Sequence, residues 1–197
     1  MNLDAWRYYL RARLFRLLGK PEATLAAYRD ALKCNPRFAP AAHGLAFLLA
    51  ARGHTGEAEK AFRQVVTLAP RDATAWFNLG FLCEKSHNTS EAIDAFRKAV
   101  QLNPKFDRAW YGLGLSAAAL GQHDNAAEAF ERAVKLDPMN GHAWYQLGMA
   151  YHHLHSPDKV RGIIEHLNRF ERHHARRLML DADRADLAHL LADLNKV

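Results

Sequence analysis

The sequence lacks the features that mark several large classes of protein. Its two cysteines, Cys34 and Cys83, stand far apart and form no C-x-x-C pair, so they indicate neither a disulfide framework nor a zinc finger. No apolar run approaches the roughly 18 residues that a transmembrane helix needs. The first residues also lack the apolar core of a secretory signal. We therefore expect a cytoplasmic protein with no membrane span.

Catalytic and cofactor-binding motifs are missing as well. The sequence contains no phosphate-binding glycine loop, no nucleophile elbow and no paired carboxylates in a catalytic motif. Eight of the twelve histidines fall between His142 and His189, and among them His152 and His155 could share one helix face. Two histidines without a third ligand make a weak metal site. We expect no enzymatic activity, no cofactor and no structural metal.

What the sequence does contain is one constant spacing that recurs along the chain. It links tryptophans, phenylalanines, glycines and prolines: Trp76, Trp110 and Trp144; Phe62, Phe96 and Phe130; Gly80, Gly114 and Gly148; Pro36, Pro70, Pro104 and Pro138. Positions related by this spacing are called a column below. Within residues 73–106, two apolar stripes with helical spacing flank a polar turn, and the closing proline stops the second stripe because it lacks an N–H. The pattern predicts pairs of helices.

Helix ends are also indicated by the sequence. We expect Asp72, Asp107 and Asn140 to cap first helices, and Ser156 to cap a helix that begins at Pro157. Because no proline follows at the usual place, this helix is expected to continue to about Leu180. A last helix over 182–195 is then expected to cap the array with one leucine-rich face: Leu187, Leu190, Leu191 and Leu194.

These units resemble bacterial-type proteins of the tetratricopeptide repeat (TPR) family. The runs A-W-F-N-L-G and E-A-I-D-A-F-R-K-A-V-Q-L-N-P, and again A-W-Y-G-L-G and A-A-E-A-F-E-R-A-V-K-L-D-P, are similar to the family signature nearly column for column. The resemblance implies an all-α fold, a right-handed α-solenoid of helix-turn-helix repeats with a C-terminal capping helix. It implies one domain over 1–197, with repeats at 5–38, 39–72, 73–106, 107–140 and 141–174. The first two repeats depart from the signature, with Tyr8 and Ala42 in the tryptophan column.

The resemblance also implies a function, because first helices line the concave groove of such arrays. We expect a protein–protein interaction scaffold or adaptor that binds a peptide or partner helix in this groove. Basic residues outnumber acids in the groove columns, so the partner is expected to be an apolar or aromatic segment with acidic flanks. The predicted groove residues are Phe47, Phe77, Asn78, Phe81, Arg108, Tyr111, Leu115, His142, Tyr145, Gln146 and Met149.

Two alternatives stay open. One is a self-assembling structural module, a homo-oligomer in which a terminal element of one copy fills the groove of the next. The other is an anionic-surface binder, to membrane or nucleic acid, through residues 1–38, which hold eight Lys or Arg against three acids. Nucleic acid is not the expected partner, because no interleaved aromatic platform accompanies these arginines.

Overall fold

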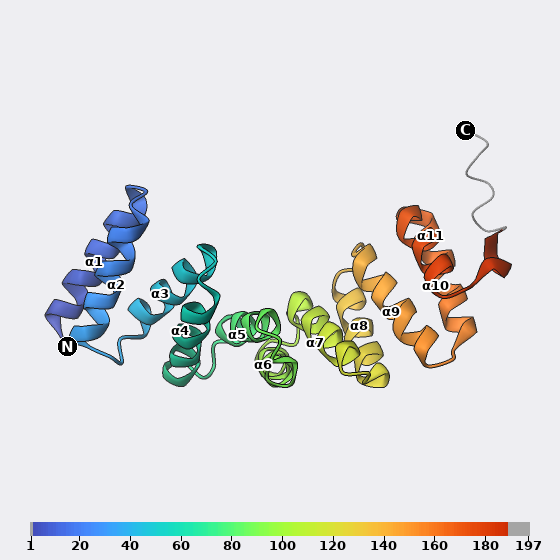
Figure 1. Cartoon of the computed structure of the whole chain (residues 1–197), viewed down its shortest axis with the longest axis horizontal. Helices are drawn as coiled ribbons and strands as arrows, with labels where there is room; N and C mark the ends of the chain where they lie inside the picture. Colours follow the sequence, from blue (N-terminus) through green and yellow to red (C-terminus); the bar gives the residue numbers. More distant parts are fainter. Residues whose placement is uncertain (1, 189–197) are drawn as a thin grey trace. The chain divides into compact units, whose positions relative to one another are not determined.

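The computed structural model describes residues 2–188, and the chain divides into two compact units, Met1–Asn103 and Pro104–Val197. The described part is all-α, as predicted, with no β-strand. The first unit contains α1 (Leu3–Leu17), α2 (Pro21–Cys34), α3 (Ala39–Ala51), α4 (Thr55–Leu68), α5 (Ala73–Lys85) and α6 (Thr89–Leu102). The second contains α7 (Asp107–Ala119), α8 (His123–Leu136), α9 (Gly141–His153), α10 (Pro157–Phe170) and α11 (Arg172–Asp181) (Figure 1).

Consecutive helices form hairpins, from α1 with α2 to α9 with α10, and one backbone feature recurs in their turns. A residue with positive φ follows the first helix of each hairpin, and these residues share one column: Gly19, Gly53, His87, Gly121 and His155. Glycine adopts this left-handed conformation without the clash that a Cβ introduces. Histidine carries that cost at two of the five turns.

The tryptophan and proline columns are explained by one type of hydrogen bond, which recurs in three repeats. The indole Nε1 groups donate to the backbone oxygens of the preceding prolines, each at 2.9 Å: Trp76 to Pro70, Trp110 to Pro104 and Trp144 to Pro138. The proline ends one repeat and the tryptophan lies in the first helix of the next. The bond therefore fixes the path by which the chain enters that first helix.

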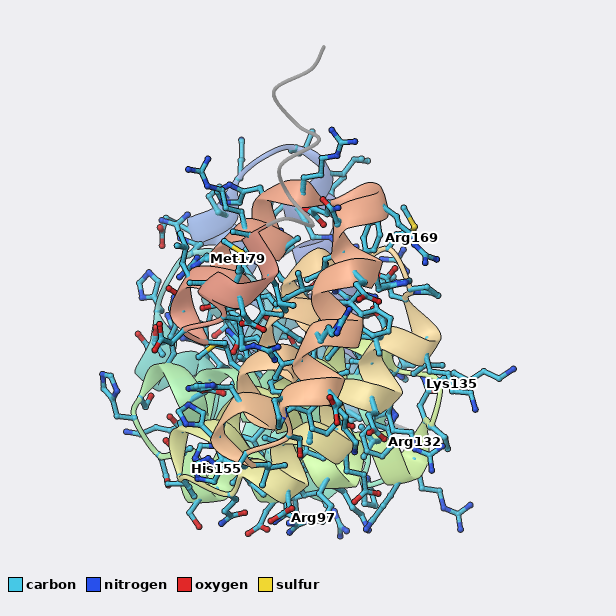
Figure 2. All side chains as sticks on the ribbon, turned by 90° about the vertical axis from the view of Figure 1, so that its right-hand side faces the viewer. Arg97, Arg132, Lys135, His155, Arg169 and Met179 are labelled. Atoms are coloured by element: carbon cyan, nitrogen blue, oxygen red, sulfur yellow. The ribbon has the colours of Figure 1, made fainter. Side chains whose placement is uncertain are left out.

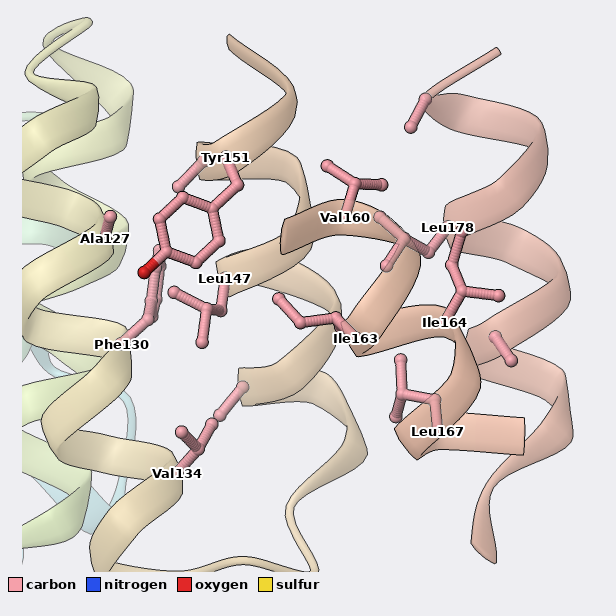
Figure 3. Close-up of a cluster of buried hydrophobic side chains, with 14 of the residues drawn as sticks. Ala127, Phe130, Val134, Leu147, Tyr151, Val160, Ile163, Ile164, Leu167 and Leu178 are labelled. Atoms are coloured by element: carbon pink, nitrogen blue, oxygen red, sulfur yellow. The ribbon is translucent and has the colours of Figure 1, made fainter. Parts of the chain in front are cut away.

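The phenylalanine and glycine columns meet inside the hairpins. Phe96 is buried under Gly80, where an added Cβ would lie 2.9 Å from the ring, and Phe130 lies under Gly114, where the distance would be 2.6 Å. The absence of a side chain at these glycines lets the first helix approach the aromatic ring of the second. In the hairpin of α9 and α10, Ile164 takes the phenylalanine position, and a side chain from α11 fills the space beside Gly148 (Figure 3).

That side chain is Leu178, and its position corrects the prediction of one long helix from Pro157 to Leu180. The helix ends at Phe170, Glu171 departs from helical geometry (φ −143°, ψ 69°), and α11 begins at Arg172. The break directs α11 onto α9, where Leu178 is fully buried. Burying such a side chain is worth about 1.5–3 kcal/mol, which helps to offset the interrupted helical hydrogen bonds.

The predicted caps were partly correct. Asp72 and Asn140 accept hydrogen bonds from the backbone N–H groups of Ala75 (2.9 Å) and Ala143 (3.0 Å), as expected. Asp107 is wrong as a cap, because it already lies inside α7. Ser156 occupies the N-cap position of α10, as predicted, but its hydroxyl donates to Leu154 O and makes no capping hydrogen bond.

The capping helix predicted over 182–195 falls largely outside the described residues. Residues 185–188 form one 3₁₀ turn in which Leu187 is buried. Its predicted partners Leu190, Leu191 and Leu194 lie beyond residue 188, so this helix stays a prediction.

Candidate functional site

In the first unit, the predicted groove residues lie on α3 and α5. Phe47 and Phe81, which belong to one column, are 43% and 52% exposed, unusually high for phenylalanine. The Phe47 ring meets the buried Phe62 edge-on, with centroids 5.2 Å apart, and stacks with His43 at 6.1 Å. The core thus holds one edge of this ring while much of its surface faces solvent.

Neighbouring side chains hold the surrounding surface in place. Phe77 is half-buried, with its ring 5.8 Å from that of Phe96, and Asn78 Nδ2 donates to Thr74 O at 2.7 Å. His43 Nε2 lies 3.0 Å from Asp72 Oδ2, a side-chain contact that joins α3 to the N-cap of α5. The repeat pattern did not indicate this contact, because it joins two different repeats.

In the second unit, the equivalent side chains on α7 and α9 are packed more tightly. Leu115 and Met149 share the column of Phe47 and Phe81, yet both are half-buried against the hydrophobic core. Tyr111 is also half-buried, with its ring 5.9 Å from Phe130, and burial raises the pKa of its hydroxyl. Arg108 is exposed, with its guanidinium 5.7 Å from the Phe106 ring centroid.

Helix α11 contacts two of the predicted groove residues on α9. The Tyr145 hydroxyl donates to Asp181 Oδ2 at 2.6 Å, and the Arg177 guanidinium lies 4.9 Å from the Tyr145 ring centroid. Burial and the bond to Asp181 raise the pKa of Tyr145. Sequence reasoning missed this contact because it extended α10 through the segment that forms α11.

The other α9 residue is His142, which reaches the buried side of α11. Its Nδ1 lies 3.2 Å from Nε2 of His174, and His174 Nδ1 lies 3.1 Å from Glu171 Oε1. The Glu171 side chain occupies the space beside Gly141, where any larger residue would collide with it. Gln146 is half-buried in the next turn of α9.

The second helices carry much of the charge. Arg63 of α4 donates to Glu59 (2.7 Å) and to Glu91 of α6 (Nη2 to Oε2, 2.8 Å), and this contact lowers the pKa of Glu91. In the second unit, Arg132 and Lys135 of α8 project outward (Figure 2).

The residues singled out for chemistry are poorly placed for it. Cys83 is fully buried, and burial raises the pKa of its thiol to about 11, so little thiolate forms near neutral pH. Within residues 2–188, no three His, Cys, Asp or Glu side chains converge as a metal site would require. No helix in the same range has the length and apolar character needed to cross a membrane.

Comparisons with known proteins agree with this architecture. The family model of the tetratricopeptide repeat matches residues 43–105, 84–138 and 111–159. No curated protein matches the chain. Among solved structures, that of MamA is 24% identical and covers 95% of this chain and 98% of its own, with a TM-score of 0.77. YrrB, described as a TPR protein with an unusual peptide-binding site, is 24% identical over 92% of both chains, with a TM-score of 0.81. PilF of Pseudomonas aeruginosa is 19% identical over 92% of this chain and 91% of its own, with a TM-score of 0.63.

Proposed function

Because the chain belongs to the tetratricopeptide repeat family, we propose that it is a protein–protein interaction scaffold or adaptor that binds a peptide or partner helix on its first helices. The observation that carries the proposal is the exposure of Phe47 and Phe81 on α3 and α5. Aromatic side chains bring a large contact area at a small entropic cost, and they dominate binding hot spots. The peptide-binding site named for YrrB, which shares the fold, supports the same interpretation.

Each unit offers its own first-helix surface. In the first unit, Phe77 and Asn78 extend the surface around Phe47 and Phe81. In the second unit, the proposed contacts are Arg108, Tyr111, Leu115, His142, Tyr145, Gln146 and Met149. Because Leu115 and Met149 are packed against the core, we expect the first unit to supply most of the binding energy.

The proposed partner is an apolar or aromatic segment flanked by Asp or Glu. Within the second unit, the Asp181 carboxylate already accepts a hydrogen bond from Tyr145 beside Arg177, an internal example of the contact expected from an acidic partner residue. The proposal involves no catalytic step and no cofactor. It places the protein in the cytoplasm, where Cys34 and Cys83 remain free thiols.

Selection of peptides from a displayed library against the full chain tests this function. We expect the enriched sequences to share large apolar residues next to Asp or Glu. Phe81→Ala should weaken binding of a peptide selected on the first unit by about 1–3 kcal/mol. Arg108→Glu should weaken, in a salt-dependent way, binding of a peptide selected on the second unit.

Met139→Ala is the matched control, because Met139 is exposed and lies between helices rather than on a first helix. Full affinity in a folded Phe47→Ala, Phe81→Ala double variant would refute the proposed site. Light scattering across the same concentrations separates peptide binding from the self-assembling alternative.

A further inference from the structure

The outer side of α1 carries an apolar stripe that faces away from the core of the first unit. Ala5 and Ala12 form the buried side of this helix. The exposed side is built from Leu3, Leu10, Leu14 and Leu17, which are 71%, 58%, 53% and 84% exposed. With Arg7 these leucines follow one another in steps of four and three residues. We call these five residues the α1 seam.

Steps of four and three residues are those by which one α-helix packs along another. At 3.6 residues per turn, the five seam residues cover about 80° of the helix circumference, and their length is about 22 Å at 1.5 Å per residue. Trp6 (38% exposed) and Leu18 (56% exposed) border the seam and widen the apolar face to about 120°. A helix that lies in a membrane surface keeps its charged side chains on the face opposite the apolar one, whereas Arg7 lies within this apolar face and pairs with Asp4. The geometry of the seam therefore favours a helical partner.

Charge defines the partner further. Arg7 lies within the seam, and Arg11 and Arg13 lie beside it, whereas Asp4 is the only acid in α1 and pairs with Arg7 at 3.3 Å. Arg13 forms no ion pair with any residue in the described range. A hollow of about 500 Å³ at the end of the seam is lined by Arg13, Leu14, Arg16 and Leu17. A complementary surface is apolar along its centre and acidic at its edges.

We propose that the α1 seam docks an amphipathic helix of another protein, with apolar residues on the leucines and Asp or Glu beside Arg11 and Arg13. A second copy of α1 is a poor fit for the same surface. Antiparallel pairing about Leu10 would place Arg7 of each copy opposite Arg13 of the other, and parallel pairing would place each arginine opposite itself. Like charges in such positions destabilise a helix pair. The seam lies on α1, whereas Phe47 and Phe81 lie on α3 and α5, so the inference concerns residues outside the proposed function.

Two synthetic helices of about three heptads test the inference. Both have leucine at the seam-facing positions, and they differ only in having Glu or Lys at the flanking positions. Binding to the full chain is measured by fluorescence anisotropy. We expect the Glu helix to bind and the Lys helix to fail. Arg11→Glu with Arg13→Glu should reverse this preference. Leu10→Ser with Leu14→Ser should lower affinity for the Glu helix by about tenfold or more.

Each of these side chains is exposed, so the variants should keep the fold, which circular dichroism verifies. The Glu helix also has the chemistry proposed for the partner of Phe47 and Phe81, so two variants are compared. Binding that Leu10→Ser with Leu14→Ser removes and Phe47→Ala with Phe81→Ala retains supports the inference, whereas the reverse pattern overturns it and leaves the proposed function standing. Equal affinity for both helices, or affinity that survives the Leu10 and Leu14 changes, would overturn the inference. So would binding to phosphatidylserine vesicles without binding to the Glu helix, or self-association that Leu10→Ser abolishes.

Discussion

The first and last described helices differ in whether their large apolar side chains are buried or exposed. Helix α11 buries Leu178 and Met179 against its own unit and turns Arg176 outward. Helix α1 buries only alanines and leaves its seam leucines in solvent, most of all Leu17 at 84%. The comparison teaches that a helix rich in leucine is not necessarily a core helix. Leucines on the side that faces the unit extend its core, whereas leucines on the opposite side form an exposed apolar surface.

The same contrast divides the column that runs through the first helices. Phe47 and Phe81 are exposed in the first unit, whereas Leu115 and Met149 pack against the core in the second. In this column, the apolar side chains exposed to a partner therefore lie in the first unit.

Replacing one leucine in α1 and one in α11 should give the largest difference in the free energy of unfolding. We expect Leu178→Ala to lower the free energy of unfolding by about 2–5 kcal/mol, because it opens a cavity beside Gly148 and Ile164. Leu10→Ala should change it by no more than about 0.5 kcal/mol, because that side chain already faces water. Urea unfolding of both variants makes the comparison, and similar losses at the two positions would contradict it.

Gly→Ala substitutions in the glycine column test whether a phenylalanine ring or a leucine beside the glycine better tolerates an added Cβ. Gly114→Ala should cost about 1–3 kcal/mol, because the new Cβ would press on the buried Phe130 ring. Gly148→Ala should cost less, because the flexible end of Leu178 can turn aside. Gly162→Ala is the control: with open space around it in α10, it should stabilise by up to about 1 kcal/mol. If thermal unfolding ranks the stability of the three variants differently, the close contact between glycine and the neighbouring side chain does not limit the packing.

Replacing the histidine of the turn column by glycine should change stability equally in both units, since the turns have the same backbone conformation. His87 and His155 have φ of 60° and 51°, which costs a residue with a Cβ about 1–2 kcal/mol. Glycine removes this cost but loses more entropy on folding, so His87→Gly and His155→Gly should each stabilise by about 0.5–1 kcal/mol. Chemical denaturation checks this, and a loss of stability at either turn would mean that the imidazole makes a stabilising contact.

The smallest expected difference between the units is in how their stability depends on pH. The contact with Arg63 holds the pKa of Glu91 below its ordinary 4.5, so the stabilisation from this contact is present above pH 4.5 and is lost as the pH falls below it. Burial and the bond to Glu131 raise the pKa of Tyr151 above its ordinary 10.0, so its stabilisation is lost as the pH rises beyond 10.0. Glu91→Gln should flatten the acid side of the stability profile and Tyr151→Phe the alkaline side. Profiles unchanged by both substitutions would exclude these groups as the cause.

The repeat fold could be predicted from the sequence because each column makes the same contact in successive repeats, as Trp76 and Trp110 do with the prolines before them. The polar turn that contains His87 was predicted, and the positive φ of His87 could have been inferred as well, since Gly53 and Gly121 occupy the same column in the repeats before and after it.

The break at Glu171 was not predictable from local signals, because neither glycine nor proline marks it. It arises from tertiary packing of α11 on α9, which periodicity within one helix cannot reveal. For the same reason, the assignment of His142 and Tyr145 to the groove could not take their contacts with α11 into account. Columns identify which residues are equivalent, whereas neighbouring helices determine how exposed each becomes.

The affinity of one selected peptide for two matched double variants tests the proposed binding surface most directly. Calorimetry would compare Phe47→Ala with Phe81→Ala in the first unit against Leu115→Ala with Met149→Ala in the second. We expect the first pair to weaken binding by at least tenfold, or about 1.4 kcal/mol, while the fold is kept. The second pair should mainly lower stability, with a smaller effect on affinity. Unchanged affinity in the first pair, with loss of binding in a folded second pair, would contradict the assignment of binding to the exposed phenylalanines of the first unit.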